Sequence, residues 1–231
     1  MTYRERATSV PGAVLWRSTQ PNASEPTRIL PDGCLDLLWD GSRLFVAGPD
    51  TAARRHQCPA GVTHVALRFS GGTGPALLGV PADELRDRSP DLADLWPTAQ
   101  VRMLTDRVAR DPVVALEEWA VERATTCETD PLGPRVLGMA LAGTPVALMA
   151  ERLGLSVRHL HRRCLPVFGY GPRRLARILR LGRALDQARA GTPLAQVAAG
   201  CGYADQAHLS REVRALTATT PTGLLRELRG R

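Results

Sequence analysis

The sequence predicts an α+β protein of two domains: an antiparallel, barrel-like β domain, followed by an all-α domain that holds two helix-turn-helix units. Three observations predict this fold. Residues 28–69 alternate apolar and polar side chains between turns, residues 131–231 have helical spacing throughout, and this second part repeats itself at an offset of 48 residues. We place the β-rich domain at residues 1–98, a helical connector at 99–129 and the helical domain at 130–231.

Short strands between turns account for the first domain. Apolar and acidic residues alternate over 35–39, and the following pair Asp40-Gly41 is typical of a hairpin turn. Two more strands are expected over 44–47 and 62–69, the last of which ends at the glycine-rich breaker of residues 71–75.

Helical signals begin beyond this breaker. A short helix is expected from Pro81 through Leu85. The connector has helical spacing that is interrupted at Asp111, a residue that can cap a helix beginning at Pro112. From Asp130 onward, the whole pattern is helical.

The repeat in the second domain follows the logic of a helix-turn-helix. In each copy, a small residue allows two helices to cross closely, a glycine permits the sharp turn, and a leucine in the second helix packs between them. These residues are Ala150, Gly154 and Leu160 in the first copy, and Ala198, Gly202 and Leu209 in the second. Ser156 and Asp205 stand where N-caps are needed. A long helix over 172–190, ended by Gly191, is expected to bridge the two copies.

The net charge of +7 is divided unevenly between the domains. Residues 1–130 carry 14 arginines and 18 acidic residues, a net charge of −4. Residues 131–231 carry 16 arginines and 5 acidic residues, a net charge of +11. This asymmetry predicts that the second domain meets a polyanion and that the first does not.

Several protein classes are excluded by composition and motif. With 44% hydrophobic and 23% charged residues, the chain belongs with ordinary globular proteins rather than disordered ones. Because it has neither an apolar run of about 18 residues nor a secretory signal, we expect a cytoplasmic protein without a membrane partner. Five scattered cysteines make a disulfide framework an unsuitable interpretation. No P-loop, dinucleotide fingerprint or Gly-x-Ser-x-Gly elbow occurs, so we expect no enzyme and no cofactor.

Three segments carry a resemblance to a known family: LGLSVRHLHRR, FGYGPRRLARILRLGRAL and GYADQAHLSREVRALTATTP. With two copies at this spacing, the part from Pro134 to Leu228 resembles the DNA-binding domain of the AraC/XylS transcription regulators. The stretches PDGCLDLLWDGSRLFVAGPDT and GVPADELRD resemble the small β-rich, cupin-like sensor domain of actinobacterial-type regulators. The resemblance implies a sequence-specific transcription regulator that is controlled by a small effector. Cys164 and Val213 depart from it, because the family usually has Phe at both positions.

Recognition of bases requires side chains on the first turns of the second helix of each unit. Helical spacing places one set of side chains on an outward face, and the resemblance assigns base contacts to it. This set is Arg158, His161 and Arg162 in the first unit, and Gln206, Ala207, Ser210 and Arg211 in the second. Phosphate contacts are expected from Ser156, Arg173, Arg174 and Arg177.

The bridging helix predicts the footprint. A helix of about 19 residues is about 28 Å long, so it can hold two recognition helices about one DNA turn apart. One monomer would then read two successive major grooves of double-stranded DNA over about 16–20 base pairs. A homodimer would extend this site to a direct or inverted repeat. Contact with RNA polymerase is left open.

Two interpretations of the first domain stay open. In one, a small-molecule effector occupies a pocket lined by Trp39, Phe45 and Arg68. In the other, His56, Cys58 and His64 form a metal- or redox-responsive sensor. These three residues are an incomplete zinc set without a clear fourth ligand, so we assign no metal site.

Overall fold

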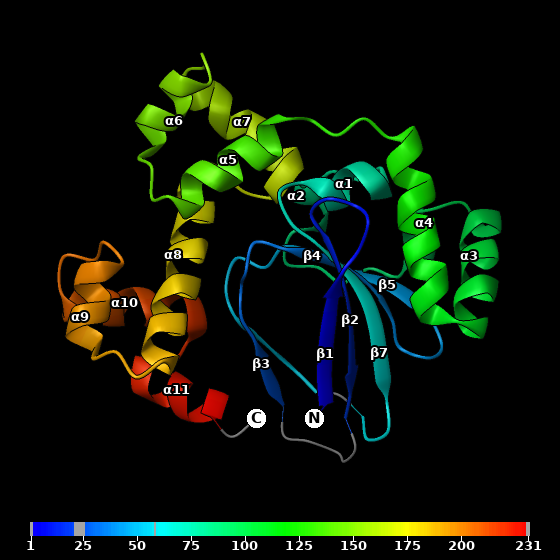
Figure 1. The fold of residues 1–231 in the computed structure, drawn as a ribbon, viewed down its shortest axis with the longest axis horizontal. Coiled ribbons are helices and arrows are strands. Elements are labelled where there is room, and N and C mark those ends of the chain that lie inside the picture. Colours follow the sequence, from blue (N-terminus) through cyan, green and yellow to red (C-terminus); the bar gives the residue numbers. More distant parts are fainter. Residues whose placement is uncertain (1, 21–25, 58, 230–231) are drawn as a thin grey trace.

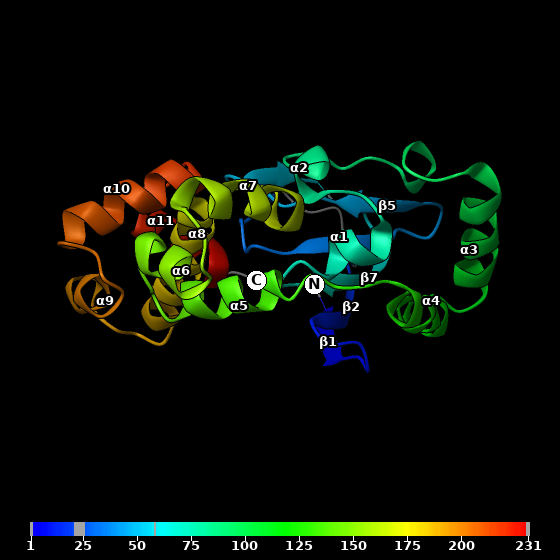
Figure 2. The same cartoon turned by 90° about the horizontal axis from the view of Figure 1, so that it is seen from above.

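The computed structural model describes residues 2–20, 26–57 and 59–229, and it confirms the predicted α+β class with a β-rich first part and a helical second part. In Figure 1 the sheet lies between two groups of helices, and Figure 2 shows these groups at opposite ends of the molecule. Among the described residues, no helix is both long and apolar enough to cross a bilayer.

The first domain contains a five-stranded antiparallel sheet with the strand order β1-β2-β7-β4-β5. Its strands are β1 (Thr2–Ala7), β2 (Ala13–Thr19), β4 (Leu35–Trp39), β5 (Leu44–Ala47) and β7 (Thr63–Phe69). A separate two-stranded sheet pairs β3 (Thr27–Ile29) with β6 (Arg54–His56). The β domain therefore consists of an open sheet and a small second sheet, of which β3 lies on the side of the C-terminal helices (Figure 1).

One face of the large sheet forms the main core. Leu37, Leu67 and Phe69 are at most 2% exposed on this face, as the alternation of apolar residues predicts. The face is covered by α3 (Thr98–Arg110) and α4 (Pro112–Thr126), and α1 (Thr73–Leu78), α2 (Ala82–Leu85) and a short 3-10 helix (Leu92–Asp94) complete the domain. The predicted connector is therefore not a separate unit, because Leu116 and Trp119 of α4 pack into the same core as the strands.

Strands β1, β2, β3 and β6 and helix α1 are not among the elements predicted from the sequence. Strand β1 lies at the edge of the sheet and is exposed along its whole length, so its sequence lacks the alternation of apolar and polar residues that indicates a half-buried strand. Helix α1 begins inside the expected breaker, where Gly72 is the N-cap with a φ of +86°. An added Cβ on Gly72 would lie 2.4 Å from Cγ1 of Val167, so this position also requires glycine for space.

Within residues 130–229, which the structure describes, the second domain has seven helices and two separate hydrophobic cores. The helices are α5 (Leu132–Leu141), α6 (Val146–Arg152), α7 (Val157–Phe168), α8 (Pro172–Arg189), α9 (Leu194–Gly200), α10 (Gln206–Thr217) and α11 (Pro221–Arg229). Helix α8 is the predicted bridging helix and contributes to both cores. Cys164 and Val213, which replace Phe of the resembled family, are at most 1% exposed in these cores.

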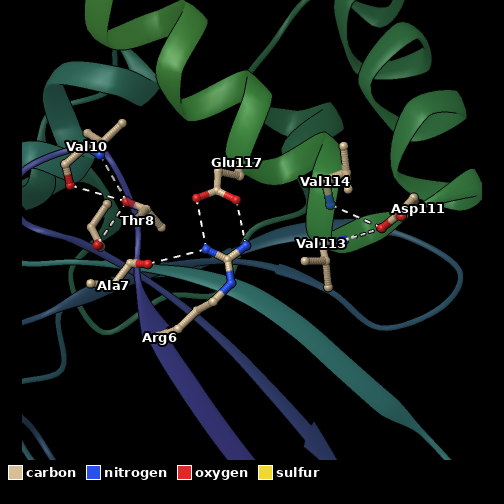
Figure 3. A network of polar contacts seen from close by, with 9 residues as sticks. Arg6, Ala7, Thr8, Val10, Asp111, Val113, Val114 and Glu117 are labelled. Atoms are coloured by element: carbon tan, nitrogen blue, oxygen red, sulfur yellow. Dashed lines mark hydrogen bonds and ion pairs between the residues drawn. The ribbon is translucent and has the colours of Figure 1, made fainter.

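Figure 3 shows how α4 begins and how it is tied to the edge of the sheet. The carboxylate of Asp111 accepts hydrogen bonds at 3.1 Å from the backbone N–H groups of Val113 and Val114, as expected for the N-cap. One turn further on, Glu117 accepts two hydrogen bonds from Arg6, at 2.9 Å and 2.6 Å. This hydrogen bond with Arg6 lowers the pKa of Glu117.

We predict unequal effects for these two contacts. Asp111→Ala should lower the free energy of unfolding by about 1 kcal/mol, because two backbone donors lose their acceptor. Arg6→Ala should change it by less than about 0.5 kcal/mol, because the ion pair is largely open to solvent. Urea denaturation of the two variants measures the difference, and equal losses would contradict this assignment.

Candidate nucleic-acid interface

The first unit presents its predicted base-reading side chains to solvent. Helix α7 begins after Ser156, whose hydroxyl accepts a hydrogen bond from the backbone N–H of His159 at 3.1 Å. Leu160 is fully buried between the helices of the unit. Arg158, His161 and Arg162 are exposed, which is the geometry that base reading requires. Their contacts with bases stay a prediction.

His161 differs from the two arginines in its surroundings. An added Cβ on Gly171 would lie 2.2 Å from Cδ2 of His161, so the imidazole lies against the backbone just before α8. The ring is consequently positioned by the protein, whereas Arg158 and Arg162 extend from exposed turns of the helix.

The second unit repeats this arrangement with an acidic cap. The carboxylate of Asp205 accepts a hydrogen bond at 2.6 Å from the backbone N–H of His208, and Leu209 is buried. Of the predicted base-reading residues, Gln206, Ala207 and Arg211 are exposed. Ser210 is half-buried and its hydroxyl donates to the Gln206 carbonyl at 2.9 Å, which makes it the least available of the four.

The arginines predicted to contact phosphate fall into two groups. Arg173 is exposed at the start of α8. Arg174 instead donates to the carbonyl of Thr51 in the first domain at 3.1 Å. Arg177 makes two hydrogen bonds with the carboxylate of Glu212 on α10, at 2.9 Å and 3.0 Å. Only Arg173 therefore has the open position that a phosphate contact needs, and the structure gives the other two a partner within the protein.

Glu212 is the centre of a cluster of polar contacts that was not predicted from the sequence. Burial raises the pKa of Glu212, but its hydrogen bonds with Arg177 and the charges of Arg177 and Arg180 outweigh burial and hold the pKa below its usual value. The guanidinium of Arg180 lies 4.5 Å from the ring centre of Tyr203. The cluster fixes α10 against α8. Its members come from α8, from α10 and from the turn before α10, so no local sequence pattern could reveal it.

The predicted effector pocket requires a correction at Trp39. Pairing of β4 with its neighbours places Leu38 opposite Phe45 and Asp36 opposite Arg68. Phe45 and Arg68 therefore share the second face of the sheet, whereas Trp39 points to the opposite face and is buried in the main core. Side chains alternate along a strand, so Trp39 cannot line a pocket with the other two.

The second face carries a half-buried ion pair. Nε of Arg68 lies 3.2 Å from Oδ1 of Asp36, and the indole of Trp16 donates to the same oxygen at 2.8 Å. Burial raises the pKa of Asp36, and the nearby charge of Arg68 opposes this rise. Burial also favours loss of the Arg68 proton, but the surrounding carboxylates more than compensate and raise its pKa. The face thus offers aromatic surface beside a fixed charge pair.

The metal or redox interpretation gains no support from the described residues. The rings of His56 and His64 lie 6.4 Å apart, but Cys58, the third member of the set, is outside the part of the chain that the structure describes. In the described part, no group of three or more His, Cys, Asp and Glu side chains could hold a metal ion. Burial raises the pKa of Cys34 well above its usual value, which disfavours the reactive thiolate form.

The two histidines predict a pH dependence of stability. Burial lowers the pKa of His64 from 6.5, as does the neighbouring His56, and burial lowers the pKa of His56 as well. The unfolded chain therefore binds more protons than the folded one just below pH 6.5, and stability should fall as the pH drops through this region. Thermal unfolding of His64→Gln should show a weaker loss on acidification than the wild type. The exposed His159→Gln is the control, and identical pH profiles for all three proteins would contradict the prediction.

Two family models match separate parts of the chain. A family model described as a helix-turn-helix domain matches residues 149–227, and one described as a domain of unknown function (DUF6597) matches residues 13–91. No curated protein sequence matches the chain.

The solved structures that are similar to the chain include three that differ from it widely in sequence. A crystal structure of ToxT from Vibrio cholerae is 12% identical, with a TM-score of 0.47 over 95% of this chain and 98% of that chain. Wild-type ToxT with a bound unsaturated fatty acid is 11% identical, with a TM-score of 0.49 over 95% of this chain and 96% of that chain. A probable AraC family transcriptional regulator from Rhodopseudomonas palustris is 21% identical, with a TM-score of 0.37 over 42% of this chain and 96% of that chain.

Proposed function

We propose that the chain is an AraC-type DNA-binding transcription regulator with a distinct N-terminal domain, and that one monomer reads two successive major grooves of a duplex. One observation carries the proposal: two helix-turn-helix units, each with an exposed recognition face, are joined by the single helix α8. Helix α8 has 18 residues, which corresponds to about 27 Å. This length suits two recognition helices that enter the same side of DNA about one turn apart.

We assign base reading to the exposed side chains of the two faces. Arg158 and Arg162 can donate two hydrogen bonds to guanine, as can Arg211 in the second unit. Gln206 can pair with adenine, and Ala207 can contact only a thymine methyl group. Arg173 and the capping hydroxyl of Ser156 are assigned to phosphate, which positions the protein without selecting a sequence.

Selection of bound duplexes from a random library tests sequence-specific reading. We expect an asymmetric site of about 16–20 base pairs with two conserved blocks. Enrichment of a single short block, or of no sequence at all, would contradict the proposal. A selected site in which both blocks recur as a repeat would indicate the homodimer.

Two arginine substitutions should separate base reading from phosphate binding. Arg162→Ala should weaken binding to the selected site by about 1–3 kcal/mol and relax base preference at one position. Arg173→Ala should weaken binding to all duplexes and lower the slope of log affinity against log salt by about one. Titrations of both variants at several salt concentrations measure these effects, and equal, sequence-independent losses would refute the assignment.

For the first domain, we propose control by a small effector that binds the second face of the sheet. The support is the combination of half-buried Phe45, the Arg68–Asp36 ion pair and the ring of Trp16 on this face. Such apolar surface with a few fixed polar groups is typical of ligand sites.

Because the proposed partner of the protein is DNA, we place the protein in the cytoplasm.

Thermal shift measurements on the full chain test the effector proposal. A compound that binds this face should raise the melting temperature of the wild type but not that of Phe45→Ala, because binding to the folded state stabilises it. Arg102→Ala is the control, because Arg102 is exposed on α3, which covers the opposite face of the sheet. Equal shifts in wild type and Phe45→Ala would place the ligand elsewhere.

A further inference from the structure

Within the helical domain, α8 contributes to the hydrophobic cores of both units and so links the two recognition helices. Leu175 and Ile178 of α8 belong to the core of the first unit, whereas Leu181 and Leu185 belong to the core of the second. Gly182 lies in this second stretch, and an added Cβ there would meet no atom within 4 Å. A glycine without a packing reason in a helix interior makes the helix easier to bend. Helix α8 alone is therefore not expected to fix the distance and angle between α7 and α10.

The first domain provides a second connection, and it begins at the end of α7. Nη1 of Arg86 donates to the carbonyl of Gly169, the C-cap of α7, at 3.0 Å. An added Cβ on Gly169 would lie 2.6 Å from Cγ of Pro49 and 3.0 Å from the carbonyl oxygen of Ala82. The end of the first recognition helix is thus in close contact with the first domain.

The small β3–β6 sheet makes the corresponding contact with the end of α10. The side chain of Arg28 on β3 is 9% exposed, and its guanidinium donates to the carbonyl of Thr217, the last residue of α10. It also makes two hydrogen bonds with Glu227 on α11, at 2.9 Å and 3.2 Å. Just before β6, the backbone N–H of Ala53 donates to the carbonyl of Leu216 at 2.7 Å.

Both contacts use the same chemistry at the same place on the helix. The last carbonyls of a helix lack hydrogen-bond donors within the helix and carry partial negative charge. A guanidinium at this end supplies both the donors and a compensating positive charge. The predicted base-reading residues lie nearer the opposite, N-terminal ends of α7 and α10, and all of them except the half-buried Ser210 are exposed. Figure 1 shows β3 beside α11 and the lower part of α8, and α2 near α7.

We propose that Arg28 and Arg86 of the first domain are positioning residues for DNA reading. By holding the C-terminal ends of α10 and α7, they keep the two recognition helices at one spacing and angle. The protein then accepts two blocks of sequence at one separation only. This inference rests on the proposed reading of two grooves, and it adds that the first domain, not α8 alone, sets the separation.

The test compares duplexes in which the two selected blocks are separated by the selected spacer or by a spacer one or two base pairs longer or shorter. The proteins are the full chain, the double variant Arg28→Lys/Arg86→Ala, and Arg6→Ala as a control whose arginine contacts Glu117 within the first domain. Arg28→Lys keeps the charge but cannot reproduce the forked contacts of a guanidinium. A duplex with one block alone measures each protein's intrinsic affinity.

The wild type and Arg6→Ala should lose affinity by about 10-fold or more when the spacer is changed, a loss comparable to that for a wrong base pair. In the double variant this loss should shrink to about threefold or less, while its affinity for the single block stays within about twofold of the wild type. General destabilisation would lower all affinities together and leave the ratio between spacers unchanged.

An unchanged spacer penalty in the double variant would overturn the inference while leaving two-groove reading intact. A wild type that shows no spacer penalty would overturn the proposed function and the inference with it. If the double variant does not fold, as judged by circular dichroism, Arg86→Ala alone decides the matter, because its side chain is exposed and its loss leaves no buried charge. For this single variant, too, a spacer penalty equal to that of the wild type contradicts the inference.

Discussion

The packing of α8 into two small cores is the constraint on which the rest of the second domain depends. Leu175 and Ile178 bury one stretch of this helix among α5 and α7, and Leu181 and Leu185 bury the next stretch among α9, α10 and α11. Each unit is too small to bury much apolar surface by itself. Because both cores include residues of α8, each unit stabilises the helix that the other packs against. The length of α8 also limits the distance between the two recognition faces.

Arginine serves two opposite purposes around this helix. Arg177 and Arg180 pair with Glu212, and Arg174 donates to the first domain, so these charges hold protein elements together. Arg158, Arg162, Arg173 and Arg211 are exposed and are open to a polyanion. The net charge of +11 in the second part therefore overstates the charge that faces DNA, and the distribution of partners determines which arginines contribute.

Local patterns in the sequence were sufficient for the elements that carry their own signals. The caps Asp111, Ser156 and Asp205 stand where the structure uses them, because capping depends on neighbours two or three residues away. Trp39 was assigned to the wrong face because the residues that share a face depend on the registers of both β5 and β7 against β4, and the pairing of β4 with β7 joins residues far apart in the sequence. The contacts of Arg28 with Thr217 and Glu227 span most of the chain, so no periodicity indicates them. The same holds for the connector, whose burial against the sheet is a property of the folded domain.

The central claim is that one monomer places two recognition helices in successive major grooves on one side of DNA. Hydroxyl-radical footprinting of the full chain on its selected site tests it most directly. The account predicts two protected patches on the same face of the duplex, with centres about 10 base pairs apart. A single protected patch, or two patches on opposite faces, would contradict it.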